Sequence, residues 1–324
     1  MANRVELAFR RAARSLLPRG TSVLVAVSGG GDSVALLHLM AGYAVGQSLR
    51  ITVAHLDHGL RRGSADDRRF VKALAGRLDL PCVSDRRSVP KLRLKGESPE
   101  EAARRVRWEF LLRAARSVGA TSVATGHTLD DQAETVLFRL VRGAGPTALA
   151  GMAAAGPGPI VRPLLGVERS ELRAYLQRRG VRFLDDPTNE EVRFDRNRVR
   201  RLVLPFLHET LNPRAARHLV QAAERLREDA ACLDMLARQA FGRVARMRPR
   251  APLSLSAAFL SRTPRPLARR VARIALERAG ADPRRITSRH LEALLALARG
   301  EEGKRLQLPS GVRAVHSRGK LLLG

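Results

Sequence analysis

The chain of 324 residues has only two cysteines, Cys82 and Cys232, which lie far apart. This excludes a disulfide framework, and it supplies no Cys-x-x-Cys pair for a metal or redox site. No apolar run approaches the roughly 18 residues of a membrane span, and the apolar stretch near the N-terminus is too short for a signal peptide. We therefore expect a cytoplasmic protein that does not enter a membrane.

Acidic and aromatic residues are also scarce. The 31 Asp and Glu face 59 Lys and Arg, which leaves a formal net charge of +28, and the excess is densest beyond residue 210. Such a surface attracts a phosphate backbone through counterion release, although a merely solvated basic face has the same composition. Nine Phe, two Tyr and one Trp are too few for a protein that binds single strands mainly by base stacking.

Up to about residue 185, short apolar runs alternate with amphipathic segments, a pattern typical of βαβ units around a parallel sheet. The expected strands are 23–27, 51–54, 81–84 and 122–125. The best-marked helix begins at Pro99 and leads into 102–118, because Ser98 is a good N-cap and Glu101 completes a capping box. The Arg-rich segment 4–17 is interpreted as an ordinary first helix rather than a transit peptide. The Gly- and Pro-rich segment 143–163 predicts a surface loop.

The length predicts about two domains. Asn212 and Pro213 open a long helical pattern that we expect to link them. The remaining pattern predicts a small α+β unit with helices at 266–279 and 288–298 and strands at 305–308, 312–315 and 321–323. We therefore expect an α/β protein, with a parallel-sheet domain over 1–210 and a linker helix with a smaller basic α+β domain over 211–324.

A glycine loop follows the first expected strand and opens a helix: Ser28-Gly-Gly-Gly-Asp-Ser33. Such a loop brings backbone N–H groups close to an anion, and the helix N-terminus adds partial positive charge, so a phosphate site is predicted. The spacings GxxxxGK[ST] and GxGxxG are both missing. A bare glycine run also makes a tight turn, and Asp32 is also a good N-cap. Beside phosphates, however, a carboxylate is best explained as a Mg²⁺ ligand.

This loop resembles the PP-loop of ATP pyrophosphatases, which cleave ATP between its α- and β-phosphates and transfer AMP to an oxygen. Further motifs follow later strands, where open α/β sheets build ligand sites. Together they resemble the shorter members of the tRNA(Ile)-lysidine synthase family over residues 20 to about 205: Ala54-His-Leu-Asp-His-Gly-Leu-Arg61, Gly126-His-Thr-Leu-Asp-Asp-Gln-Ala-Glu-Thr135, Arg162-Pro-Leu-Leu165, Asp186-Pro-Thr-Asn189 and Arg196-Asn-Arg-Val-Arg200. The chain departs from that pattern at Thr128, usually His, and at Trp108, commonly Tyr.

The resemblance implies a PP-loop domain of the adenine nucleotide α-hydrolase type and a defined reaction. ATP, with Mg²⁺, adenylates the C2 oxygen of the wobble cytidine (position 34) of tRNA(Ile) with a CAU anticodon, releasing pyrophosphate. Free L-lysine then displaces AMP to form lysidine, which switches codon reading from AUG to AUA. The alternatives are another PP-loop tRNA-modifying enzyme, such as a 2-thiolase, for which this chain lacks a cysteine pair, or a non-catalytic basic RNA-binding protein.

A lysine substrate brings an ammonium that a carboxylate must recognise and deprotonate. Asp131 and Glu134 meet that need, as does Asp130, which is also a good N-cap. His127, at a strand end, either bonds phosphate or substrate or is a structural histidine. With Asp32, these are the candidate catalytic residues.

The expected ATP-binding residues are Ser28, Gly29, Gly30, Gly31, Asp32, Ser33, His55 and His58. The two histidines are expected to shape the nucleotide pocket, because one short loop offers too few ligands for a metal. The expected tRNA or substrate contacts are Arg104, Arg107, Arg196, Asn197 and Arg200, for which a solvated arginine stripe is the alternative. Trp108 is expected in the core. The sequence leaves open whether two chains form a homodimer.

Overall fold

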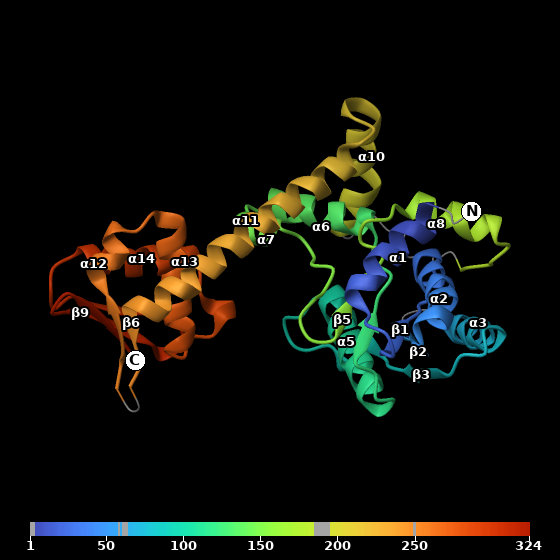
Figure 1. The fold of residues 1–324 in the computed structure, drawn as a ribbon, viewed down its shortest axis with the longest axis horizontal. Coiled ribbons are helices and arrows are strands. Elements are labelled where there is room, and N and C mark those ends of the chain that lie inside the picture. Colours follow the sequence, from blue (N-terminus) through green and yellow to red (C-terminus); the bar gives the residue numbers. More distant parts are fainter. Residues whose placement is uncertain (1–3, 58, 60–63, 185–194, 249–250) are drawn as a thin grey trace. The chain divides into compact units, whose positions relative to one another are not determined.

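The computed structural model describes residues 4–57, 59, 64–184, 195–248 and 251–324. The chain divides into two compact units, Met1–Glu224 and Arg225–Gly324, and the division falls inside a long helix, α11 (Ala215–Val244) (Figure 1). Asn212 caps the entry to this helix, since its Oδ1 accepts the backbone N–H of Arg214 at 2.8 Å. Among the described residues, no helix combines the length and apolar character that crossing a bilayer requires.

The first unit is built on a parallel sheet with the strand order β3-β2-β1-β4-β5. Its strands are β1 (Ser22–Ala26), β2 (Arg50–Asp57), β3 (Cys82–Arg86), β4 (Ser122–Ala124) and β5 (Ile160–Val161). The four expected strands are confirmed. The prediction of a loop over 143–163 was wrong in part, because β5 and the short helix α7 (Pro146–Leu149) lie within it.

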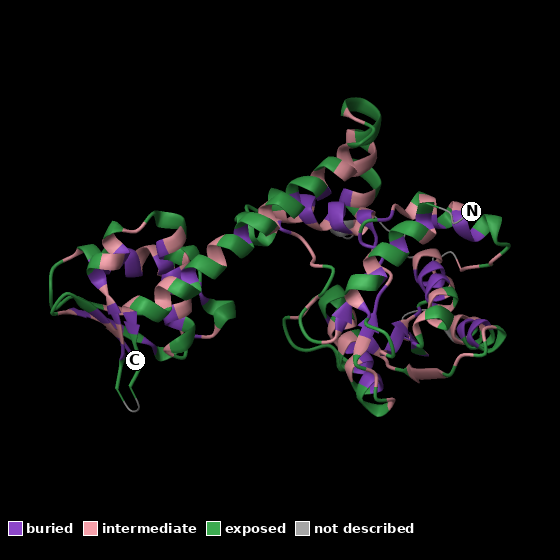
Figure 2. Cartoon of the chain, viewed as in Figure 1, coloured by how far each residue is buried: buried purple, intermediate pink, exposed green. Residues whose placement is uncertain are grey.

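Helices cover both faces of this sheet (Figure 2). Burial on both faces explains why the strands are nearly continuous apolar runs. On one face, Phe9, Leu37 and Leu172 join one core, so the expected helix over 4–17 is confirmed as a helix. On the other face, Val106 and Phe110 of α5 (Pro99–Ser117) pack on the sheet. The remaining helices of the unit are α1 (Arg4–Leu16), α2 (Gly31–Ala44), α3 (Ser64–Arg77), α4 (Val89–Leu92), α5 (Pro99–Ser117), α6 (Leu129–Val141), α8 (Arg169–Arg178), α9 (Asp195–Arg198) and α10 (Leu204–Phe206).

Helix α5 begins where the sequence predicts. The Ser98 hydroxyl accepts the N–H of Glu101 at 3.2 Å, and the Glu101 carboxylate accepts the N–H of Ser98 at 2.8 Å. This reciprocal pair satisfies two of the backbone donors that a helix start leaves without intrahelical partners. The capping box therefore fixes the start of the helix that covers one face of the sheet.

We expect Ser98→Ala to lower the free energy of unfolding by about 1 kcal/mol, because an N-cap oxygen is lost. Denaturant titration of the full chain measures the change. Ser117→Ala is the matched control, since that hydroxyl bonds only the carbonyl of Ala114 at the other end of α5. Equal effects of the two substitutions would contradict the capping role.

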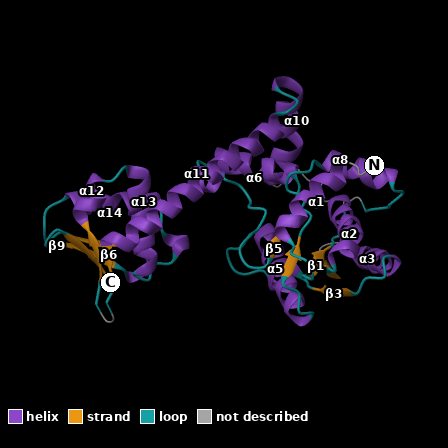
Figure 3. Cartoon of the chain, in the orientation of Figure 1, coloured by secondary structure: helices purple, strands orange, loops and turns teal. Residues whose placement is uncertain are grey.

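The second unit is built on an antiparallel sheet with the order β6-β7-β10-β9-β8, and helices, including the end of α11, share its core (Figure 3). Its elements are β6 (Ala245–Arg246), β7 (Leu253–Ser256), α12 (Ala257–Arg262), α13 (Arg265–Arg278), α14 (Ser288–Arg299), β8 (Arg305–Gln307), β9 (Arg313–Ser317) and β10 (Lys320–Leu323). The two helices and three strands expected here are confirmed, whereas β6, β7 and α12 were missed.

Candidate active site

The glycine loop joins β1 to the N-terminus of α2. The Ser33 hydroxyl donates to the carbonyl of Gly30 at 2.8 Å and accepts the N–H of Ser28 at 3.1 Å, which closes the turn. Gly29 has a φ of +100°, and a Cβ there would lie 2.9 Å from Cδ1 of Leu184. A side chain would therefore be strained and crowded at this position. The loop leaves the α2 N-terminus directed at the site, as anion binding requires.

The loops after β1 and β4 lie side by side at one edge of the sheet. From there the chain connects these two neighbouring strands to opposite halves of the sheet. β1 continues through α2 to β2, while β4 continues to β5 on the other side. A switch point of this kind is where open α/β sheets bind ligands. A Cβ on Gly126 would lie 3.1 Å from the carbonyl carbon and oxygen of Asp32. Glycine at position 126 thus lets the second loop approach the first closely.

The second loop opens α6, and Thr128 is its N-cap. The Thr128 hydroxyl accepts the N–H of Asp131 at 3.3 Å, and Oδ2 of Asp131 accepts the N–H of Thr128 at 2.8 Å. The interpretation of Asp130 as the N-cap was therefore wrong. Oδ2 of Asp130 instead accepts the backbone N–H of Arg169 at 2.8 Å. Asp130 thus connects the starts of α6 and α8.

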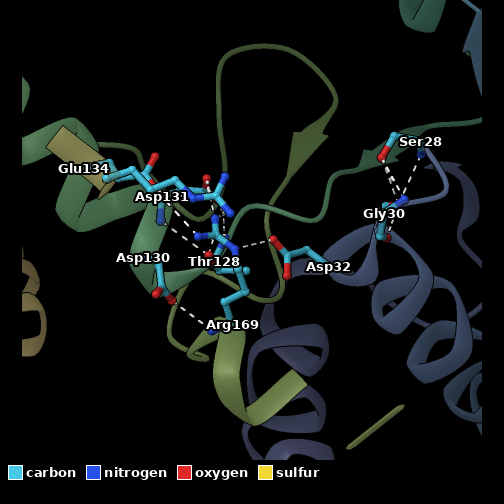
Figure 4. Close-up of polar contacts among 10 residues, drawn as sticks. Ser28, Gly30, Asp32, Thr128, Asp130, Asp131, Glu134 and Arg169 are labelled. Atoms are coloured by element: carbon cyan, nitrogen blue, oxygen red, sulfur yellow. Dashed lines mark hydrogen bonds and ion pairs between the residues drawn. The ribbon is translucent and has the colours of Figure 1, made fainter. Parts of the chain in front are cut away.

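Arg169, the first residue of α8, lies between the carboxylates (Figure 4). Its Nε is 2.9 Å from Oδ2 of Asp32, and its Nη2 is 3.2 Å from Oδ1 of Asp131. Its Nη1 is 3.6 Å from Oε1 of Glu134. The Arg169 side chain is only 14% exposed. One guanidinium therefore ties the phosphate loop to Asp131 and Glu134 of α6.

Sequence reasoning missed Arg169, although one signal pointed to it. Four carboxylates gathered at one site need a compensating cation, because burial makes an unpaired charge costly. The motif that begins at Arg162 leads directly to the start of α8.

Asp32 and Asp131 share the cavity wall with Arg107, Arg169, Arg173 and Arg200. Burial raises the pKa of Asp32, and the charges of Asp131 and Asp130 add to the rise, while Arg169 opposes it. A second cation, Arg200, has its Nε 3.8 Å from Oε1 of the buried Glu134. Burial lowers the pKa of Arg200, as does the nearby charge of Arg169. Asp32 and Asp131 are the carboxylates that an ammonium or a divalent metal ion in the cavity would meet.

These groups surround a cavity of about 360 Å³. The expected site residues on its wall are Ser28, Gly30, Gly31, Asp32, Ser33, Arg107, His127, Asp131 and Arg200. His127 shares a hydrogen bond of 2.8 Å with the hydroxyl of Thr125, another wall residue. The core assignment of Trp108 was wrong in part, because this half-buried side chain also lines the cavity, 5.9 Å from the Arg107 guanidinium. The wall thus combines a phosphate loop with an aromatic surface.

Other expected site residues lie off this wall. The cavity touches Ala54 and Leu56, so the alternation of side chains along β2 turns His55 to the other face. The buried His55 donates from Nδ1 to the carbonyl of Val27 at 2.9 Å and supports the end of β1. Glu134 and Asp130 contact Arg169 and do not line the cavity. Also off the wall are Gly29, Arg104 and Asn197.

His58, the motif 186–189 and the side chain of Arg196 lie outside the described residues. Within the described ranges, no group of three or more His, Cys, Asp or Glu is placed to hold a metal ion.

Two family matches cover most of the chain. Residues 2–207 match the PP-loop domain family, and residues 255–322 match the TilS substrate binding domain. A tRNA(Ile)-lysidine synthase from Thermus thermophilus is 43% identical over 317 residues, which cover 98% of this chain and 59% of that relative. One from Thermobifida fusca is 38% identical over 320 residues, which cover 98% of this chain and 96% of that relative. The chain thus spans about three-fifths of the first relative and nearly all of the second.

A solved structure with the same fold is the U34-tRNA thiolase NcsA from Methanococcus maripaludis. It aligns with a TM-score of 0.60 over 69% of this chain and 78% of that chain, at 16% sequence identity. At this identity the likeness concerns the fold alone.

Proposed function

Because the chain belongs to the tRNA(Ile)-lysidine synthase family, we propose that it joins the ε-amine of free L-lysine to C2 of the wobble cytidine in tRNA(Ile) with a CAU anticodon. The observation that carries this proposal is the link that Arg169 makes between the phosphate loop and the acids of α6. One cavity thereby offers a place for a nucleotide and a place for an amine. Since its substrate is a tRNA, the enzyme would work in the cytoplasm.

In the first step, the triphosphate of ATP rests on the loop Ser28–Ser33 and the N-terminus of α2. The C2 oxygen of cytidine attacks the α-phosphorus, the bond to the bridging oxygen of the β-phosphate breaks, and pyrophosphate leaves. Backbone N–H groups and arginines aimed at the phosphates offset the charge that develops there. Arg107 and Arg200, which line the cavity, are placed for this task, and His127 is placed to donate to a phosphate oxygen.

The residues fit a magnesium ion held jointly with ATP. Mg²⁺ commonly binds to one or two carboxylates and completes its shell with phosphates and waters. Asp32 is the candidate ligand, since its half-buried carboxylate has a raised pKa that a divalent cation would oppose. Bound Mg²⁺ would neutralise part of the phosphate charge. Arg169, which pairs with Asp32, would have to share this carboxylate with it.

In the second step, the lysine ammonium approaches Asp131, which lines the cavity. The Asp131 carboxylate accepts a proton from the ammonium, and the neutral amine attacks C2 of the adenylated cytidine. Glu134, which is buried off the wall, would support this step through its ion pair with Arg169. The bond between C2 and the oxygen that carries AMP then breaks, so that AMP leaves with that oxygen. Further contacts to tRNA are assigned to Arg104, Arg196 and Asn197 and to the basic second unit, whose residues 255–322 match a substrate-binding domain.

The test is to incubate the full chain with ATP, labelled lysine and an unmodified tRNA(Ile) transcript with a CAU anticodon. Label is expected in the tRNA, with AMP released in equal amount. A transcript with a changed wobble base is the control and is expected to stay unlabelled. AMP release at the same rate without lysine, or a sulfur-modified nucleoside in cell-derived tRNA, would contradict the assignment. RNA binding without any AMP release would favour a non-catalytic protein.

A further inference from the structure

Arg162, the residue directly after β5, is a buried cation that the proposed reaction does not use. It is only 6% exposed. Its Nη1 donates to the carbonyl of Ala153 at 2.7 Å, but its Nε has no hydrogen-bond partner. A Cβ on Gly156 would lie 2.7 Å from Nη1, so the backbone of the preceding loop lies directly against the guanidinium.

No acid compensates this charge: among the ion pairs of the described residues, none includes Arg162. Burial lowers the pKa of Arg162, and the positive charge of Arg104 lowers it further. Buried charges in folded proteins are normally paired, because an unpaired one loses its hydration without compensation. A second arginine nearby makes the local charge more positive still.

The sheet places the two arginines on the same side. Val161 packs in the core between the sheet and α2, so the alternation along the strand directs Arg162 toward the opposite face, which α5 covers. Arg104 is an exposed residue of α5. Thr125, which lines the cavity, donates its N–H to the carbonyl of Val161 at 3.0 Å. The arginine pair therefore lies beside the cavity and not within it.

We propose that Arg162 and Arg104 together bind a phosphate group beside the active site. A guanidinium presents donors that match phosphate oxygens, and an exposed partner gives the anion a way in. Two sources share this chemistry: a backbone phosphate of the tRNA, or the pyrophosphate released from ATP. The tRNA source rests on the proposed function, whereas the phosphate site itself does not.

Arg162→Met is the informative substitution, because the two roles of Arg162 predict opposite effects on stability. If Arg162 binds phosphate, the variant loses phosphate affinity while its Tm stays equal or rises, since an uncompensated buried charge is removed. If Arg162 only anchors the carbonyl of Ala153, the variant has a lower Tm and an unchanged phosphate affinity. Arg104→Gln is expected to lose affinity without any change in Tm. Arg116→Gln, an exposed arginine of the same helix, is the matched control.

The full chain is titrated with unmodified tRNA(Ile) at several salt concentrations and, separately, with inorganic pyrophosphate. For a tRNA site we expect about tenfold weaker binding and a salt slope reduced by about one for each arginine removed. Weaker pyrophosphate binding with unchanged tRNA affinity would assign the site to the leaving group. Unchanged affinity for both in Arg104→Gln and Arg162→Met overturns the proposal. If Arg162→Met fails to fold, the same titrations of Arg162→Lys and Arg104→Gln decide between these outcomes.

These binding measurements do not depend on lysine ligation. A wild-type chain that forms no lysidine would refute the proposed function and leave the phosphate site open to the same test.

Discussion

Asp32→Asn is expected to lower the rate of lysidine formation by about 100-fold or more, because it removes the carboxylate that joins the phosphate loop to Arg169. The affinity for tRNA is expected to stay unchanged. The thermal stability of the variant, in contrast to its rate, is expected to increase. Burial raises the pKa of Asp32, so its ionised form opposes folding, and the stability that Asp32 contributes is present at low pH and lost as pH rises through its folded pKa. The variant should therefore have a higher Tm near pH 8, and this gain should shrink toward pH 4.

Single-turnover assays with saturating ATP, and thermal unfolding measured across that pH range, check both parts. Asp229→Asn is the matched control, since Asp229 is an exposed residue of α11. A rate within threefold of wild type would remove Asp32 from the reaction. A lower Tm at pH 8 would mean that the pairing with Arg169 outweighs the cost of burying the carboxylate.

The fold could be predicted where short-range signals are strong. Strands β1, β2 and β4 contain short apolar runs because both faces of the sheet are buried, and α5 begins at a complete capping box. The strand β5 was missed because two residues, Ile160–Val161, are too short to show any periodicity. Its neighbours are glycine and proline, which favour a loop. It is a strand only because β4 offers it an edge to pair with.

The residues of the site could likewise be predicted where their signal lies within one short segment of sequence. The phosphate loop and the acids of α6 each lie in one contiguous motif after a strand, so the sequence places them at the same edge of the sheet. Arg169 lies 38 positions from Asp131, and only the tertiary fold, which sets the start of α8 beside the start of α6, brings them together. His55 was expected in the nucleotide pocket because it lies in a motif. The two-residue period of β2 turns it away, a point that the motif alone does not reveal.

We expect Arg169→Lys to lower kcat/KM for lysine by about 100-fold, although it keeps the charge. Three guanidinium nitrogens contact three different carboxylates, whereas an ammonium is a compact point charge that cannot bridge them. Since Arg169 would act by positioning Asp131, adding Arg169→Lys to an Asp131→Asn variant should cost far less than it costs in the wild type. Steady-state kinetics of the two single variants and the double variant measure this coupling.

The charge of Arg169 can be separated from its shape by Arg169→Gln. Arg169 holds down the pKa of Asp32, so the neutral variant should raise that pKa further and move the acid limb of the pH–rate profile to higher pH. Arg169→Lys keeps the charge and should leave the limb in place. Arg178→Gln, an exposed residue at the other end of α8, should change neither the limb nor the rate. Fully additive effects of Arg169→Lys and Asp131→Asn, together with an unmoved acid limb in Arg169→Gln, would mean that Arg169 only stabilises the fold. Non-additive effects with a shifted limb would assign it a role in orienting the acids that receive the lysine amine.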